Sequence, residues 1–455
     1  MKHTHVKSLV ILATIIGIAN CALAIQWVGN TSVNPFWDTP SNWANYALAW
    51  DTYLNSGSSS ADPVLIINGV AASQSGLMLG QNAGHSGYLI NEGELDSTGT
   101  MNVGYGGYGE FINRGSTVLG RLDIGGGGGN GVFIHESGTL VIGGHSTGNT
   151  QLFYFGNGGN AYFRAEADFS ISSHLNLALR FCQAPGNDPE NPLTSIMEMG
   201  ASCTGMVNSV AIGFNGVNTD ARLMMRGGTL ILKPDWNPEL QLQPTSTVRG
   251  WGEISGGRLT AFKGKVIADA EGEPGRDLDF RNYYSGNFSP PTAGSGWYAV
   301  NKGRILFHEF TTTNAYYNAG DREANTALVA ANSARIELSG RQEGTIKPFL
   351  VAQDHNSVPH IGYKEGSAKA VWHIQTPSFT NARFLVRYDS AAVDDPTRIC
   401  LLRYDPTAQK WTRVNAAHNP STYQFDATNL LPQGADNLGF FALVELPLPT
   451  FLFLR

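Results

Sequence analysis

The chain is poor in charge, in cysteine and in long hydrophobic runs. Charged residues make up 15% of its 455 residues, with 30 basic against 37 acidic side chains and no basic cluster. So low a charged fraction argues against a solvated coiled coil, and the lack of a basic cluster predicts no nucleic-acid binding. The four cysteines form no CxxC pair and no His/Cys cluster, which predicts no metal site. No motif calls for a cofactor.

Glycine is abundant instead, with 54 residues. The glycines have no strict third-residue period, so a collagen triple helix is excluded. A hydrophobic fraction of 42% is too high for a disordered chain. The composition therefore indicates a folded protein with many tight turns.

The N-terminal segment 1–24 has the features of an export signal. Lys2 and Lys7 supply positive charge, residues 9–19 form an apolar core, and Ala22-Leu23-Ala24 fits the small-x-small cleavage rule. We expect cleavage after Ala24 and a mature chain that is secreted or held at the cell surface or outer envelope. The mature chain has no apolar run long enough for a transmembrane helix.

Export permits disulfide bonds, and three cysteines remain after cleavage: Cys182, Cys203 and Cys400. Cys182 and Cys203 are close enough in sequence to pair. Spacing alone does not decide between this disulfide and separate buried thiols.

A regular repeat gives the strongest structural signal. Tyr88, Glu110 and Val132 are evenly spaced and occupy equivalent places in three similar segments, each with short alternating apolar runs bounded by glycine. Such runs suit strands, and a period in the low twenties fits one coil of a β-solenoid. An antiparallel sandwich is the rival, but the fixed spacing favours stacked coils. We expect an all-β chain with a right-handed parallel β-helix over residues 69–310.

Aromatic residues gather at the start of the mature chain, among them Trp27, Trp37 and Trp43. Residues 25–68 are predicted to form an N-terminal cap and first coil that cover the open end of the solenoid. The alternative is a sugar-stacking platform made by these tryptophans or by Tyr105 and Tyr108.

The C-terminal part has a different pattern. From about residue 325 glycine thins out, and alternating strands appear, for example over residues 370–374 and 440–444. Alternation means that one face of each strand is buried and the other is exposed. Residues 325–455 are therefore predicted to form an antiparallel β-sandwich module.

Several segments resemble secreted bacterial β-solenoid proteins of the autotransporter-like, C-terminal-sorting-signal type. The segments that carry this resemblance are 27–29, 36–38, 42–43, 62–67, 248–254, 256–259, 264–268, 296–306, 388–389, 402–405, 410–411 and 440–442. The resemblance implies a solenoid followed by a small β-sandwich. This family is largely uncharacterised and provides no catalytic residues to carry over.

Enzymatic motifs are incomplete. Pectin-lyase-like enzymes also use parallel β-helices, and Asn218-Thr219-Asp220 matches the first tripeptide of polygalacturonase-like hydrolases. The Asp-Asp that should follow nearby and the Gly-His-Gly that completes the pattern are both absent. Asp394-Asp395 lies far along the chain, in the C-terminal module. The glycine run 125–129 is not followed by Lys-Ser/Thr, so it is no phosphate loop. We assign no catalytic residue.

The sequence therefore predicts an exported, non-catalytic structural, surface-display or adhesion protein. The first alternative is a carbohydrate-active enzyme, a polysaccharide lyase or glycoside hydrolase, that works on the solenoid face. The second is a glycan-binding module. The expected partners are extracellular polysaccharide or components of the cell envelope.

Overall fold

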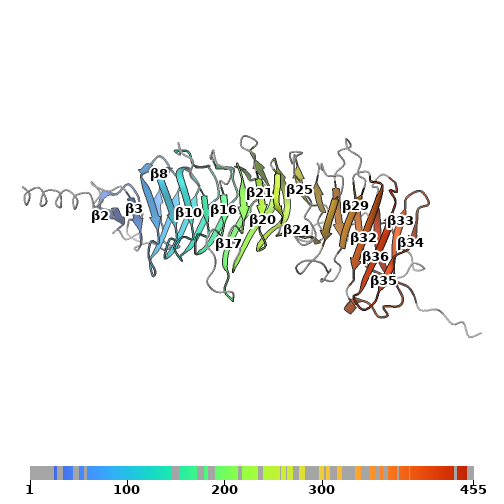
Figure 1. Cartoon of the computed structure of the whole chain (residues 1–455). Helices are drawn as coiled ribbons and strands as arrows, with labels where there is room; N and C mark the ends of the chain where they lie inside the picture. Colours follow the sequence, from blue (N-terminus) through green and yellow to red (C-terminus); the bar gives the residue numbers. More distant parts are fainter. Residues whose placement is uncertain are drawn as a thin grey trace, which may run out of the picture. The chain divides into compact units, whose positions relative to one another are not determined.

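A computed structural model describes most of the chain (Figure 1). The predicted signal peptide, residues 1–24, lies outside the described residues. The chain divides into two compact units, residues 1–173 and 174–455. The described residues are 25–27, 34–44, 51–55, 59–145, 153–171, 179–182, 190–213, 218–233, 239–256, 258–262, 264–269, 276–281, 297–301, 304–307, 315–319, 334–339, 349–353, 359–361, 367–376, 379–388, 390–434 and 438–447.

The first unit consists of short strands and one turn of 3₁₀-helix. In chain order these are β1 (Ile25–Trp27), η1 (Pro40–Asn42), β2 (Trp43–Ala44), β3 (Asp51–Leu54), β4 (Val64–Ile66), β5 (Ala71–Gln74), β6 (Gly76–Leu79), β7 (Ser86–Asn91), β8 (Glu94–Val103), β9 (Tyr108–Asn113), β10 (Ser116–Ile124), β11 (Asn130–His135), β12 (Thr139–Ile142), β13 (Phe153–Phe155), β14 (Asn160–Ala165) and β15 (Phe169–Ile171).

The sequence repeat is the register of the stacked coils. Strands β7, β9 and β11 pair in parallel, so that Tyr88 lies beside Glu110 and Glu110 beside Val132. Burial alternates along each strand. The buried positions place Phe111 over Phe133, with ring centroids 4.8 Å apart. Each coil thus covers the apolar side of the next, and the predicted parallel β-solenoid is confirmed.

Glycine at the strand starts allows the backbones to approach closely. Gly87, Gly109 and Gly131 are register partners in β7, β9 and β11. A Cβ atom on Gly109 would lie 2.3 Å from the backbone nitrogen of Gly104, a separation that no side chain tolerates. The glycine that recurs in the repeat is therefore required by close packing at the corner of the coil.

A buried polar ladder closes the other end of these strands. Asn91 donates to the Asn113 side-chain oxygen at 3.0 Å, and the Asn113 amide donates to His135 Nδ1 at 3.0 Å. Thr117 donates to the same Asn113 oxygen. Because Nδ1 accepts, His135 Nε2 carries the proton that it donates to the Asp168 carbonyl at 2.9 Å. Equivalent positions of successive coils thus satisfy one another.

The segment predicted as a cap begins with a pairing of mixed direction. Strand β1 is antiparallel to β2 and parallel to β3. Strand β3 pairs in parallel with β6, and β4 with β7. Trp37 is buried, and the backbones of Phe36 and Leu65 form a parallel bridge.

Parallel coils also make up the first part of the second unit. Their strands are β16 (Leu179–Phe181), β17 (Leu193–Met199), β18 (Thr204–Val207), β19 (Val210–Ile212), β20 (Thr219–Leu232), β21 (Glu239–Leu242), β22 (Ser246–Ser255), β23 (Arg258–Phe262), β24 (Lys265–Asp269), β25 (Asp277–Arg281), β26 (Trp297–Asn301) and β27 (Arg304–Phe307). The long face pairs β17, β20, β22, β24 and β26 in parallel succession.

Pairing then becomes antiparallel, starting with β27 against β30 and β28 against β29. The remaining elements are β28 (Ala315–Ala319), β29 (Ala334–Ser339), β30 (Phe349–Gln353), β31 (Ser367–Gln375), β32 (Asn381–Arg387), η3 (Ser390–Ala392), β33 (Ile399–Asp405), β34 (Lys410–Arg413), β35 (Ala417–Asn419), β36 (Gln424–Leu430) and β37 (Gly439–Glu445).

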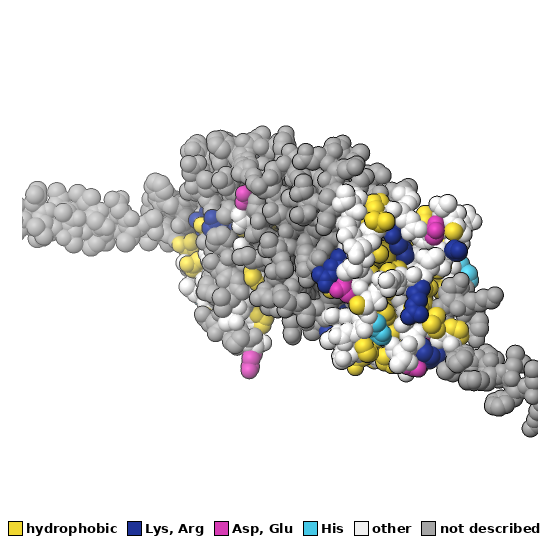
Figure 2. Space-filling view, turned by 45° about the vertical axis from the view of Figure 1, so that its right-hand side comes forward, with side chains coloured by type: hydrophobic (Ala, Val, Ile, Leu, Met, Phe, Trp, Pro, Cys, Tyr) yellow, Lys and Arg dark blue, Asp and Glu magenta, His cyan; other side chains and the backbone are white. Residues whose placement is uncertain are grey.

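These antiparallel strands form two groups that share a core. One group contains β29, β32 and β36, and the other contains β31, β37 and β33. Phe384 of the first group contacts Trp372 and Phe441 of the second, with ring centroids 5.8 and 4.6 Å apart. The predicted C-terminal antiparallel module is confirmed. On its surface, basic, acidic and apolar side chains are interspersed (Figure 2).

Candidate functional site

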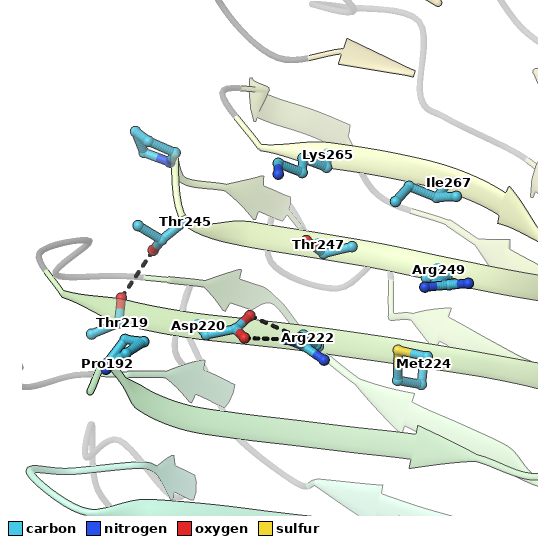
Figure 3. Close-up of a pocket in the computed structure, with 11 residues that line it drawn as sticks. Pro192, Thr219, Asp220, Arg222, Met224, Thr245, Thr247, Arg249, Lys265 and Ile267 are labelled. Carbon is cyan, nitrogen blue, oxygen red and sulfur yellow. Dashed lines mark hydrogen bonds and ion pairs between the residues drawn. The ribbon is translucent and has the colours of Figure 1, made fainter. Parts of the chain in front are cut away.

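The candidate site is a pocket of about 680 Å³ on the outward face of β20, β22 and β24 (Figure 3). Ala221, Leu223 and Met225 of β20 point inward and are buried. The side chains between them therefore point outward, as strand alternation requires. The residues that line the pocket are Pro192, Thr219, Asp220, Arg222, Met224, Pro244, Thr245, Thr247, Arg249, Lys265 and Ile267.

Register arranges the lining side chains in rows across the strands. Arg222 is the partner of Thr247, and Thr247 is the partner of Lys265. In the next outward row, Arg249 lies between Met224 on one side and Ile267 on the other. Stacked parallel strands thus hold each side chain at a fixed spacing of about 4.8 Å from its partner.

Two ion pairs fix the arginines of the pocket. Arg222 Nε donates to Asp220 Oδ1 at 2.8 Å, and Arg222 Nη2 donates to Asp220 Oδ2. This pairing raises the pKa of Arg222. Arg249 donates through Nε to Asp269 Oδ2 at 2.7 Å and also through Nη2. The Asp269 side chain is only 6% exposed, whereas the Arg249 side chain is 47% exposed.

Hydroxyl groups and apolar surface complete the lining. Thr219 Oγ1 and Thr245 Oγ1 are hydrogen-bonded at 2.9 Å, and Thr247 stands between Arg222 and Lys265. Met224 and Ile267 provide apolar contacts. The lining thus combines cations, hydroxyl donors and acceptors, and non-polar surface.

The arrangement suits binding better than bond cleavage. Glycoside hydrolysis uses two carboxyl groups that face each other across the scissile bond. Among the described lining residues the single carboxylate is Asp220, and both of its oxygens accept from Arg222. Thr219 and Asp220 belong to the tripeptide that resembles polygalacturonases, and in this chain Asp220 orients an arginine.

Other carboxylates of the solenoid are engaged in separate local contacts. Asp96 pairs with His145. Asp123 is buried, which raises its pKa to about 6 against the opposing effect of Arg121, whose guanidinium lies 2.9 Å away. Within the described ranges, no group of three or more His, Cys, Asp or Glu residues is placed to hold a metal ion.

The aromatic residues that the sequence suggested as a sugar platform lie in different surroundings from one another. Trp37 is 6% exposed, and the backbones of Trp27 and Trp43 are partners in the β1–β2 pair. Tyr105 is 45% exposed. The Tyr108 hydroxyl donates a hydrogen bond to Glu110 at 2.8 Å. Burial, and to a lesser extent this hydrogen bond, raises the pKa of Tyr108.

Tyr105 has a packing role beside the glycine run. A Cβ atom on Gly126 would lie 2.8 Å from the Tyr105 ring. Gly125, Gly127 and Gly128 have positive φ. The run 125–129 is thus a turn between β10 and β11 whose small residues make room for the tyrosine.

Among the described residues, Cys182, Cys203 and Cys400 are buried free thiols, and the structure shows no bond between Cys182 and Cys203, the pairing that the sequence left open. Cys182 Sγ lies 3.2 Å from Ser195 Oγ, and burial raises the pKa of this thiol to about 11.

Within the described residues, no helix is long and apolar enough to cross a membrane.

Sequence reasoning missed the three cations of the pocket, Arg222, Arg249 and Lys265. The usable signal was strand alternation, because each is an outward position in a strand of apolar and polar residues. Comparison of the chain with protein-family models, with curated proteins and with solved structures finds no match.

Proposed function

We propose that this chain is an exported, non-catalytic protein whose β-solenoid is a rigid scaffold that presents a binding surface outside the cell. Its export is inferred from the N-terminal segment, where a charged start, an apolar core and Ala22-Leu23-Ala24 follow one another.

The supporting observation is that charged and polar groups of the repeat link one coil to the next. Arg114 lies 3.1 Å from Glu92 in the preceding coil and 2.7 Å from Glu136 in the following one. Exposed pairs of this kind add little stability one by one, but a ladder of them fixes the register. The buried Asn91–Asn113–His135 ladder does the same inside. A scaffold uses its polar groups in this way.

A carbohydrate-active enzyme is the alternative that needs testing. The purified mature protein should leave a panel of acidic and neutral polysaccharides at their original chain length, measured by size-exclusion chromatography. Reproducible shortening of any of them would defeat the non-catalytic proposal. Mass determination of the exported protein should give an N-terminus at Ile25, and retention of residues 1–24 would contradict export through this signal.

A further inference from the structure

We propose that the pocket on β20, β22 and β24 binds a carboxylate-bearing polysaccharide through Arg222, Arg249 and Lys265. The choice of a polysaccharide as the molecule that carries the carboxylates rests on the proposed extracellular function. The anionic character of the ligand comes from the pocket alone.

Cationic side chains gather in the pocket, whereas the chain as a whole is acidic. The whole chain has a net charge of −7. The pocket lining has three cations and one carboxylate, Asp220, and Asp269, outside the lining, pairs with Arg249. Elsewhere on the solenoid, Arg114 is shared by two glutamates and Arg281 contacts both Asp279 and Glu253. Cationic groups that line one concave place offer an anion several charge-assisted hydrogen-bond donors there.

The arginines are held ready for a ligand. A guanidinium has five N–H donors in a planar fork. Asp220 and Asp269 engage Nε and Nη2 of their arginines, which leaves the Nη1 donors directed elsewhere. The side chains of Arg222 and Arg249 are 46% and 47% exposed. Their ion pairs restrict the rotamers in advance, so that less entropy is lost when a ligand binds.

The spacing favours an extended ligand with repeated charges. The three cations come from three successive strands, so they span about 10 Å across the sheet at the usual strand separation. Cations spread in this way match a ligand that carries several charges better than a single small anion. A chain of sugar acids that runs across the strands presents one carboxylate after another.

The rest of the lining favours a sugar over other polyanions. Thr245 and Thr247 offer hydroxyls to sugar hydroxyls, and Met224 and Ile267 offer non-polar surface to ring C–H groups. The described lining contains no aromatic side chain. Single-stranded nucleic acids depend on aromatic stacking, and neutral sugars depend on aromatic platforms. Charge and hydroxyl contacts are what this pocket provides.

Isothermal titration of the full mature chain with polygalacturonate, and with neutral dextran as a matched probe, tests the proposal. We expect binding to polygalacturonate and none to dextran. The double variant Arg222→Gln/Lys265→Gln should weaken binding by about tenfold or more, because charge-assisted hydrogen bonds are lost. Lys265→Gln alone leaves both arginine pairs intact and should weaken it less.

Arg281→Gln is the control, since it removes one exposed cation outside the pocket. It should leave the affinity unchanged within about twofold, and circular dichroism should show that every variant is folded. Equal weakening by Arg281→Gln, tight binding of a dT oligonucleotide, or equal affinity for monomeric galacturonate would each overturn the proposal. Absence of binding would overturn it and leave the scaffold proposal standing, whereas shortening of the polymer would defeat the non-catalytic scaffold.

Discussion

The stacked phenylalanines make the solenoid core sensitive to a single truncation. Phe133 is fully buried between Phe111 and Phe163, with ring centroids 4.8 and 5.4 Å away. Phe133→Ala removes a buried ring and leaves a cavity, which costs about 3–5 kcal/mol. The two lost ring contacts place the cost toward the upper end of that range.

Native-state hydrogen exchange is the appropriate assay, because coils of a solenoid contact only their neighbours and can open locally. Amide protection in β9, β11 and β14 should fall by about 10²- to 10⁴-fold. Val132→Ala is the control on the outward face of the same strand, and it should change protection by about threefold or less. A fall of under about tenfold for Phe133→Ala would refute the stacked core.

Three further results follow from the described contacts. Burial lowers the pKa of His135 below its usual 6.5, so the neutral ring stabilises the fold above that pH and this stability is lost on acidification. The difference in unfolding free energy between the wild type and His135→Asn should therefore change on acidification. A difference that does not depend on pH would contradict this role of His135. Gly109→Val should destabilise by more than about 1 kcal/mol, because its Cβ meets the Gly104 nitrogen; unfolding in urea measures this, and an unchanged midpoint would count against the corner. Cys182, whose pKa is raised to about 11 by burial, should resist iodoacetamide at mildly alkaline pH until denaturant is added; fast labelling of the native protein would contradict its burial.

The sequence predicts the first coils well because residues that are register partners in neighbouring coils are separated by a constant number of positions. Gly87, Gly109 and Gly131 are evenly spaced in the sequence and are register partners in the structure. The next partner of Gly131 is Ala161, which follows at a longer interval. Connecting segments outside the strands vary in length without disturbing the stack, so the period fades while the fold continues.

The candidate site was less visible for the same reason. Arg222, Arg249 and Lys265 are unequally spaced in the sequence, and their outward rows follow only from the observed pairing. Residue type directed attention to tryptophans instead, and Trp37 is buried. A large aromatic side chain serves a core as readily as a sugar, so its identity alone does not reveal its role.

The central claim, in-register stacking of parallel coils, is tested most directly by a cysteine cross-link. Glu110 and Val132 are outward-facing partners. Their Cα atoms should be about 4.8 Å apart, within the range that a disulfide bridges. Mild oxidation of Glu110→Cys/Val132→Cys should give a disulfide that peptide mapping detects. Glu110→Cys/Ile134→Cys, which is out of register, should give none. A cross-link in the second pair and not in the first would contradict the solenoid.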